Sequence, residues 1–405
     1  MRGVGIALIA ASLMILMFVI YRNSNIGNKP LIFSPTQVLG ATWHTYKLNF
    51  ISSSTPRTID PSRDNQTTSE GQSYTMLRAV WMGDKETFDA TWEFTKKNLQ
   101  HTTDALFAWL YGTRDDGTMG VLVAQNGGTA ASDADSDIAL ALLFAYARWQ
   151  DPQYLAESKR IISSIWQKEV VVIDGVPYLA ADNKEKALEK EAILINPSYF
   201  APYAYRLFAK VDPAHPWQEL VDSSYALLKE SITAPLGGDA AGSLPPNWVL
   251  LNTAGHLQAP TSVGQDTHYG YDAMRIPWRI ALDWQWNHDP RAKEVLSLLS
   301  PLGNAWQKNK ALDTVYSHTG VPVGTYESPA MYGGSIGYFL VTDPQEAEAL
   351  YTTKLAYLYD PNSNGWKQPL SYYDDNWAWF GIALYNNLLP NLAAELPPNA
   401  FTTHL

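Results

Sequence analysis

Acidic side chains stand at three points where the sequence predicts the start of a helix. Glu70 opens one segment, Asp272 opens another, and Asp133, Asp135 and Asp137 precede a third. Two carboxyl groups in opposite protonation states can perform general acid and general base chemistry on one substrate. The sequence therefore offers carboxylates for catalysis, provided that the fold brings these distant segments together.

A purely structural interpretation exists for each site. Thr67 and Glu70 have the spacing of a capping box, and Asp272 can serve as an N-cap. A helix N-terminus also favours the ionised form of a carboxylate. If a helix begins at Asp272, Arg275 lies one turn further on the same face and can hold a carboxylate. Three aspartates within five residues exceed what capping requires, because clustered carboxylates repel one another.

Composition excludes several other chemistries. The chain of 405 residues has no cysteine, so disulfides, thiolate nucleophiles and Cys-ligated metals are ruled out. Its net charge of −11 argues against a nucleic-acid partner. The 15 Trp and 23 Tyr against 12 Phe favour flat surfaces with polar edges, which suit a saccharide cleft, although a large helical core could use the same residues.

Two motif matches fail on closer reading. Residues 333–337 read Gly-Gly-Ser-Ile-Gly, but no strand pattern precedes Ser335 and only His404 follows it, which excludes a nucleophile elbow. Residues 133–137 begin like a calcium loop, yet Ile138 and Phe144 occupy the positions that need Gly and Glu. The eight histidines are scattered, and neither a metal nor another cofactor is expected.

Hydrophobic patterning predicts an all-α protein. Residues 4–20 form an uncharged apolar run without a small-residue cleavage site. This favours an uncleaved signal anchor over a cleaved signal peptide. With either segment, the chain is expected to be exported from the cytoplasm, to the periplasm or outside the cell. Residues 31–405 are expected to form one catalytic domain and a monomer. Helical periodicity covers residues 74–97, 136–149, 152–168, 217–228, 272–286, 290–307, 344–358 and 372–387, and residues 170–173 and 176–179 flank a hairpin turn.

Four sequence blocks resemble glycoside hydrolase family 8. They are Ser-Glu-Gly-Gln-Ser-Tyr at 69–74, Ala-Ser-Asp-Ala-Asp-Ser-Asp-Ile-Ala at 131–139, Asn-Pro-Ser-Tyr at 196–199 and Tyr-Asp-Ala-Met-Arg-Ile-Pro-Trp at 271–278. The resemblance implies an (α/α)6 barrel of six helical hairpins that hydrolyses a β-1,4-linked glycan, usually cellulose, with inversion. It further implies Glu70 as general acid, Asp272 as general base and Asp133 as the aspartate that binds sugar at the cleavage point.

The same resemblance assigns Arg275 as the neighbour of Asp133 and places Trp109, Tyr199 and Tyr373 in the cleft. Tyr271 is a further candidate for stacking on a sugar because it adjoins the general base, and Trp43, Trp248 and Tyr372 are weaker ones. Like-charge proximity to Asp133 is predicted to keep Glu70 protonated.

The expected partner is a β-1,4-linked polysaccharide or oligosaccharide, with a membrane contact if the first segment is retained. Three neighbouring activities remain open, on chitosan, xylan or mixed-linkage glucan, because the same carboxylates would serve each of them. A non-catalytic glycan-binding protein is an alternative of a different class.

Overall fold

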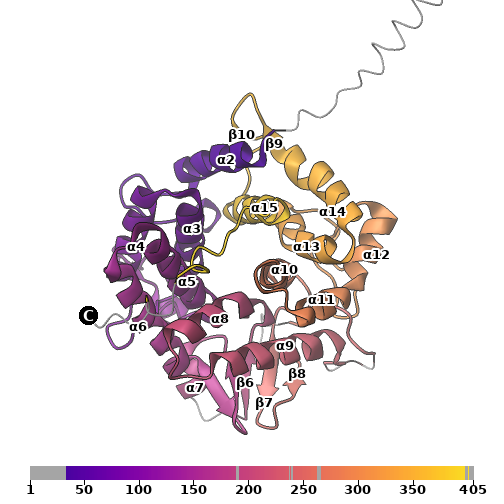
Figure 1. Ribbon diagram of the computed structural model, residues 1–405, viewed down its shortest axis with the longest axis horizontal. Helices are drawn as coiled ribbons and strands as arrows, with labels where there is room; N and C mark the ends of the chain where they lie inside the picture. Colours follow the sequence, from indigo (N-terminus) through magenta and orange to yellow (C-terminus); the bar gives the residue numbers. More distant parts are fainter. Residues whose placement is uncertain are drawn as a thin grey trace, which may run out of the picture.

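The computed structural model describes residues 33–187, 191–236, 238, 240–261, 266–396 and 400. Its helices form two concentric rings (Figure 1). The outer ring consists of α2 (Pro35–Phe50), α4 (Lys85–Asn98), α6 (Pro152–Lys168), α9 (Trp217–Thr233), α11 (Pro290–Ser297) with α12 (Ser300–Asn309), and α14 (Pro344–Leu350). The inner ring consists of α3 (Ser69–Met82), α5 (Ser132–Trp149), α8 (Pro202–Val211), α10 (Arg275–Asn287), α13 (Pro329–Thr342) and α15 (Tyr372–Tyr385).

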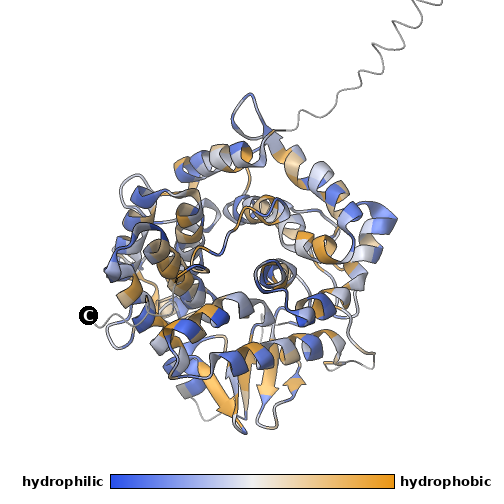
Figure 2. Cartoon of the chain, viewed as in Figure 1, coloured by the Kyte–Doolittle hydropathy of each residue, from blue (hydrophilic) through white to orange (hydrophobic). Residues whose placement is uncertain are grey.

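Each inner helix follows an outer one in the chain, so the fold is the (α/α)6 barrel of helical hairpins that the sequence predicts. The inner helices lie between the outer ring and the barrel centre and are therefore buried on nearly all sides. In α5 every residue from Ser132 to Ala145 is buried. The outer helices have a polar face as well, and Figure 2 shows both hydrophilic and hydrophobic residues on them.

Several predicted helices have different boundaries. The segment 74–97 is divided, because Gly83 ends α3 with a left-handed φ of 74° and Asp84 caps α4 by accepting the Thr87 amide. The segment 290–307 is divided into α11 and α12. Helices α2, α8 and α13 were not predicted, and α13 in particular is rich in glycine, which disfavours helices in isolation.

The predicted hairpin is confirmed as β4 (Val170–Ile173) and β5 (Val176–Leu179), joined by Asp174 and Gly175 with positive φ. Other strands were not predicted. A first sheet joins β1 (Thr67–Thr68), β2 (Leu110–Thr113) and β3 (Met119–Val121), and a second joins β6 (Ala192–Ile195), β7 (Val249–Asn252) and β8 (Leu257–Gln258). The remaining α-helix and strands are α7 (Asn183–Ala187), β9 (Tyr359–Asp360) and β10 (Gly365–Trp366). The predicted helix 344–358 is α-helical only to Leu350 and continues as a π-helical turn, Tyr351–Leu355, and a 3-10 turn, Ala356–Leu358.

The glycines of the 333–337 motif allow α13 to approach two other inner helices closely. Ser335 is fully buried within α13 and follows no strand, so it is no nucleophile elbow. A Cβ atom at Gly333 would lie 1.9 Å from the carbonyl oxygen of Trp377 in α15. One at Gly337 would lie 2.1 Å from the carbonyl oxygen of Pro277 in α10. The motif is therefore a contact surface between helices.

Gly333→Ala is expected to lower the free energy of unfolding by about 3 kcal/mol, because backbone atoms cannot move aside as a side chain would. Urea denaturation would measure this. Gly128→Ala is the matched control, since the nearest atom to a Cβ there is 3.9 Å away. Equal stability of the two variants would contradict the close contact.

Among the described residues, no helix is long and apolar enough to span a membrane. The predicted anchor at residues 4–20 lies outside the described part of the chain.

Candidate active site

Glu70 lies in the first turn of α3. The cap of this helix is Thr68, whose hydroxyl accepts the Gly71 amide at 3.0 Å, and not Thr67 as the capping-box spacing predicted. Thr67 instead donates its hydroxyl to the carbonyl oxygen of Thr58 at 2.6 Å. The pairing of β1 with β2 brings the chain into α3, and the Ser69 amide donates to the carbonyl oxygen of Trp109. Glu70 is thereby fixed beside the segment that carries Trp109.

The three clustered aspartates of α5 have three separate partners. Asp133 accepts from Arg275 at 3.1 Å, and Asp137 forms two hydrogen bonds with Arg279, at 2.9 and 2.7 Å. The two aspartates are four residues apart on α5, and the two arginines are four residues apart on α10. Two successive turns of α5 therefore pair with two successive turns of α10. Asp135 accepts the Phe107 amide at 3.0 Å. The cluster is therefore tolerated because two of its charges face arginines.

Asp272 precedes its helix instead of capping it. Helix α10 begins at Arg275, and residues 271–274 form a turn in which the Arg275 amide donates to the Asp272 carbonyl oxygen. The carboxylate of Asp272 accepts from Arg275 Nη2 at 2.6 Å. The predicted relation between Asp272 and Arg275 is thus present, in a turn and not in a helix.

Arg275 connects the three carboxylates. Its Nη1 donates to Glu70 Oε2 at 2.9 Å and to Asp133 at 3.1 Å, while its Nη2 binds Asp272. The hydroxyl of Ser198 accepts from the same guanidinium at 2.8 and 3.1 Å and donates to Asn196 at 2.7 Å. Arg275 itself is buried, so its position is fixed by these contacts.

One guanidinium group separates Glu70 Oε2 from Asp272 Oδ1. The two hydrogen bonds of 2.9 and 2.6 Å and the span of the group keep these oxygens within about 8 Å of each other. Inverting glycosidases hold their two carboxyl groups roughly 6.5–9.5 Å apart, which leaves room for a water molecule. Residues that are 202 positions apart in the sequence therefore lie close enough to act on one bond.

The environment of Glu70 favours the protonated form of its carboxyl group. Burial raises the pKa of Glu70 to about 7; Arg275 opposes this, and Asp133 and Asp272 add to it. Burial is thus the main cause, and the predicted effect of Asp133 is secondary. The Asp272 side chain is 33% exposed against 24% for Glu70, and its carboxylate is paired with Arg275. The site contains one carboxyl suited to donating a proton and one carboxylate suited to accepting one.

The pKa of Glu70 predicts the pH dependence of activity. A general acid acts in its protonated form, so the role that the family resemblance implies for Glu70 predicts that kcat/KM falls as the pH rises through about 7. A pH–rate profile of the purified chain would measure this basic limb. A profile that stays level to pH 9 would contradict a proton donor with this pKa.

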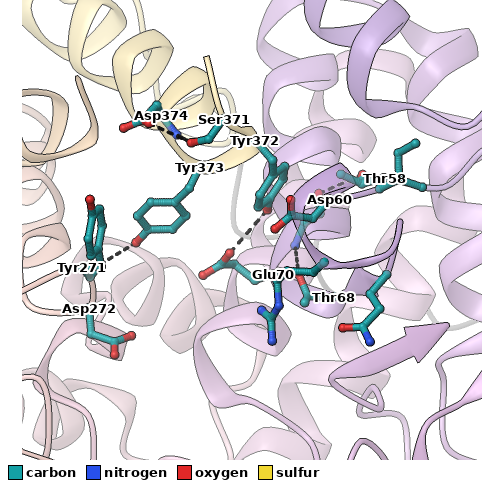
Figure 3. A pocket seen from close by; sticks show the side chains of 14 residues that line it. Thr58, Asp60, Thr68, Glu70, Tyr271, Asp272, Ser371, Tyr372, Tyr373 and Asp374 are labelled. Atoms are coloured by element: carbon teal, nitrogen blue, oxygen red, sulfur yellow. Dashed lines mark hydrogen bonds between the residues drawn. The ribbon is translucent and has the colours of Figure 1, made fainter. Parts of the chain in front are cut away.

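A pocket of about 390 Å³ opens at these carboxylates (Figure 3). Glu70 and Asp272 line it together with Tyr271, Tyr372 and Tyr373. The rings of Tyr271 and Tyr373 meet edge to face with centroids 5.8 Å apart, and the Tyr373 hydroxyl donates to the Tyr271 carbonyl oxygen at 2.6 Å. These tyrosines present the surface of flat rings and polar edges that a sugar requires.

The other predicted residues have distinct positions. Tyr199 lies beneath Arg275, 5.2 Å from its guanidinium, and packs edge to face on Trp248. Trp109 is partly exposed and donates its indole N–H to the Asn126 carbonyl oxygen at 3.0 Å. Trp43 is buried in the core and bound to Asp84, so it is no cleft residue. Asp133, with a side chain 4% exposed, reaches Arg275 and not the open pocket.

The sequence offered Tyr372 only as a weaker stacking candidate, and it gave no signal for several other residues of the site. The Tyr372 hydroxyl donates to Glu70 Oε1 at 3.4 Å, a contact that no local pattern indicates. Thr58, Asp60 and Gln66 line the pocket from the connection between α2 and α3. Polar residues in a connection carry no periodic signal, so only the closed fold shows that they face the carboxylates. No cluster of metal-ligating side chains occurs among the described residues.

A helical barrel that holds two carboxyl groups and a wall of tyrosines in one pocket has the architecture of a glycoside hydrolase. The family model of glycosyl hydrolases family 8 matches residues 13–368. The chain belongs to this family.

Individual relatives agree with this assignment. The chain is 31% identical over 275 residues to endoglucanase 2 of Ruminiclostridium josui, covering 66% of this chain and 54% of the relative. It is 27% identical to an endoglucanase of Escherichia coli K12 over 364 residues, or 87% and 91% of the two chains. The chain thus matches about half the length of the R. josui protein, and 52% of endoglucanase C of Ruminiclostridium cellulolyticum. The solved endo-1,4-D-glucanase of Vibrio fischeri ES114 superposes with a TM-score of 0.73 at 25% identity, covering 86% of this chain and 95% of that one.

Proposed function

We propose that this protein is an inverting endo-β-1,4-glucanase acting on cellulose-type glucan. The observation that carries the proposal is the single guanidinium of Arg275, which joins Glu70, Asp133 and Asp272 at the wall of an open pocket. The names of the relatives, endoglucanases from several bacteria, support a β-1,4-glucan as the substrate.

The proposed reaction is one displacement. Glu70 transfers its proton to the glycosidic oxygen as the bond from that oxygen to the anomeric carbon breaks. Asp272 takes a proton from a water molecule whose oxygen forms a bond to the same carbon from the opposite face. The product has the opposite anomeric configuration, Glu70 is left ionised and Asp272 protonated, and exchange with solvent restores both. Arg275 holds the two groups in place and reduces the charge repulsion between them, and Asp133 in turn holds Arg275.

A reducing-sugar assay on carboxymethylcellulose, chitosan, xylan and mixed-linkage glucan in parallel tests the substrate. The greatest rate is expected on carboxymethylcellulose, with a rapid fall in viscosity that marks internal cleavage. NMR of the fresh product is expected to show the α-anomer. A greater rate on another of these glycans would show that glycan, and not cellulose-type glucan, to be the preferred substrate. Binding without product on all four would favour a non-catalytic glycan-binding protein.

We further propose that the chain acts outside the cytoplasm as a monomer tethered by residues 4–20. The support is the uncharged apolar run of these residues. Cell fractionation of the full chain is expected to place it with membranes, and a truncated chain starting at residue 31 is expected to stay in the cytoplasm. Gel filtration of that truncated chain would measure its mass.

A further inference from the structure

Asn247 holds the turn that carries the proposed general base. Its side-chain oxygen accepts the backbone N–H of Gly270 at 3.1 Å and that of Ala273 at 3.0 Å. These two N–H groups flank Tyr271 and Asp272 in the chain. A single amide oxygen therefore closes the loop from which the Asp272 carboxylate projects.

Asn247 is itself fixed from two sides. Its backbone N–H donates to the carbonyl oxygen of His268 at 2.7 Å, and its side-chain N–H donates to Asp266 Oδ1 at 3.2 Å. Upstream, the amides of Ser243 and Leu244 both donate to the carbonyl oxygen of His318. The Asn247 side chain thus has a hydrogen-bond partner for both its oxygen and its N–H group.

The second sheet explains why Asn247 lies there. Strand β7 begins two residues after Asn247 and pairs with β6, whose end at Ile195 leads into Asn196 and Ser198. Strand β6 thereby positions Ser198 beside Arg275, and strand β7 positions Asn247 beside the turn that contains Asp272. Two strands of one sheet support both groups on the base side of the site.

We propose that Asn247 is a positioning residue for Asp272 and that its carbonyl oxygen sets the orientation of the base toward the attacking water. This inference rests on the proposed function. Tyr271, in the same turn, has a separate anchor in the Tyr373 hydroxyl, so substrate binding through its ring does not depend on Asn247 alone. Loss of the amide oxygen should therefore affect the transition state more than the binding of substrate.

The test compares three variants of the full chain on carboxymethylcellulose. Asn247→Ala is expected to reduce kcat about tenfold to a hundredfold, because small displacements of a catalytic group have effects of this size, with KM changed less than about threefold. Asn252→Ala is the matched control, because the Asn252 side-chain oxygen likewise accepts two backbone N–H groups, those of Ala254 and His256 at 3.0 Å each, in a turn that does not line the pocket. Its kcat is expected to stay within about twofold of the wild type.

The double variant N247D/D266N exchanges amide and carboxyl, so that position 247 still accepts both N–H groups and position 266 supplies the donor. It is expected to recover most of the lost kcat. Wild-type kcat in Asn247→Ala would overturn the inference. So would a loss of kcat in Asn247→Ala that comes with an equal rise in KM and that the double variant does not restore. An inactive wild-type chain would overturn the proposed function and this inference together, whereas an active wild type with a fully active Asn247→Ala overturns only the inference.

Discussion

Replacement of Glu70 by Gln is expected to reduce kcat on carboxymethylcellulose about a thousandfold. Gln has the shape of a protonated Glu and can keep a contact with Arg275, but it has no proton to transfer to the leaving oxygen. Because Glu70 lies in a partly buried position that disfavours its charge, the variant should fold normally. Initial rates of reducing-sugar release, measured beside a thermal melt, would establish both points.

A substrate with an acidic leaving group provides the control. The leaving group of a 2,4-dinitrophenyl cello-oligosaccharide is a stable phenolate that needs little protonation. Glu70→Gln should therefore retain a far larger fraction of the wild-type rate on this substrate than on the polymer. The basic limb of the pH profile should disappear in the variant. If Glu70→Gln keeps more than a tenth of the wild-type rate on the polymer, Glu70 is not the general acid.

The same variant has a stability signature. The pKa of Glu70 in the folded chain, about 7, lies above its ordinary value of 4.5, so the neutral form stabilises the fold. In the wild type, the contribution of Glu70 to the free energy of unfolding is greatest below pH 4.5 and falls as the pH rises to about 7. Glu70→Gln should lack this fall, and urea denaturation at pH 5 and pH 8 would show it as a gain over the wild type at the higher pH only.

Replacement of Asp272 by Asn is expected to reduce kcat by about a thousandfold on both the polymer and the dinitrophenyl substrate. The base acts on water, so a better leaving group cannot compensate for its loss. This equal loss distinguishes Asp272 from Glu70. Asp116→Asn, at an exposed aspartate that only caps Thr118, is the control and should keep the wild-type rate.

Azide gives a positive test of the base. It is a small nucleophile that needs no deprotonation, so added azide should restore turnover in Asp272→Asn and form a glycosyl azide, with no rescue in Glu70→Gln. A variant Asp272→Asn that loses activity on the polymer alone, or that azide leaves inactive, would show that Asp272 is not the base.

The sequence alone predicted the candidate site residues and located most of the helices. Helical periodicity located α6 to the residue, because a surface helix alternates polar and apolar faces, and the Asp174-Gly175 turn located the β4–β5 hairpin. Four short blocks, by their resemblance to glycoside hydrolase family 8, proposed Glu70, Asp133, Asp272 and Arg275 as site residues. Helix α13 was missed because its glycines are explained only by the helices that touch it.

Tertiary structure alone decided how those residues lie relative to one another and how far each is buried. The pKa of Glu70 is governed mainly by burial, which depends on the whole barrel and not on the neighbouring residues in the chain. Asp272 lies in a turn held by Asn247, and Arg275 meets three carboxylates that the sequence shows only as separate helix starts. Sequence specifies local preferences and chemical types, whereas distances and local dielectric come into existence only when the six hairpins close into a ring.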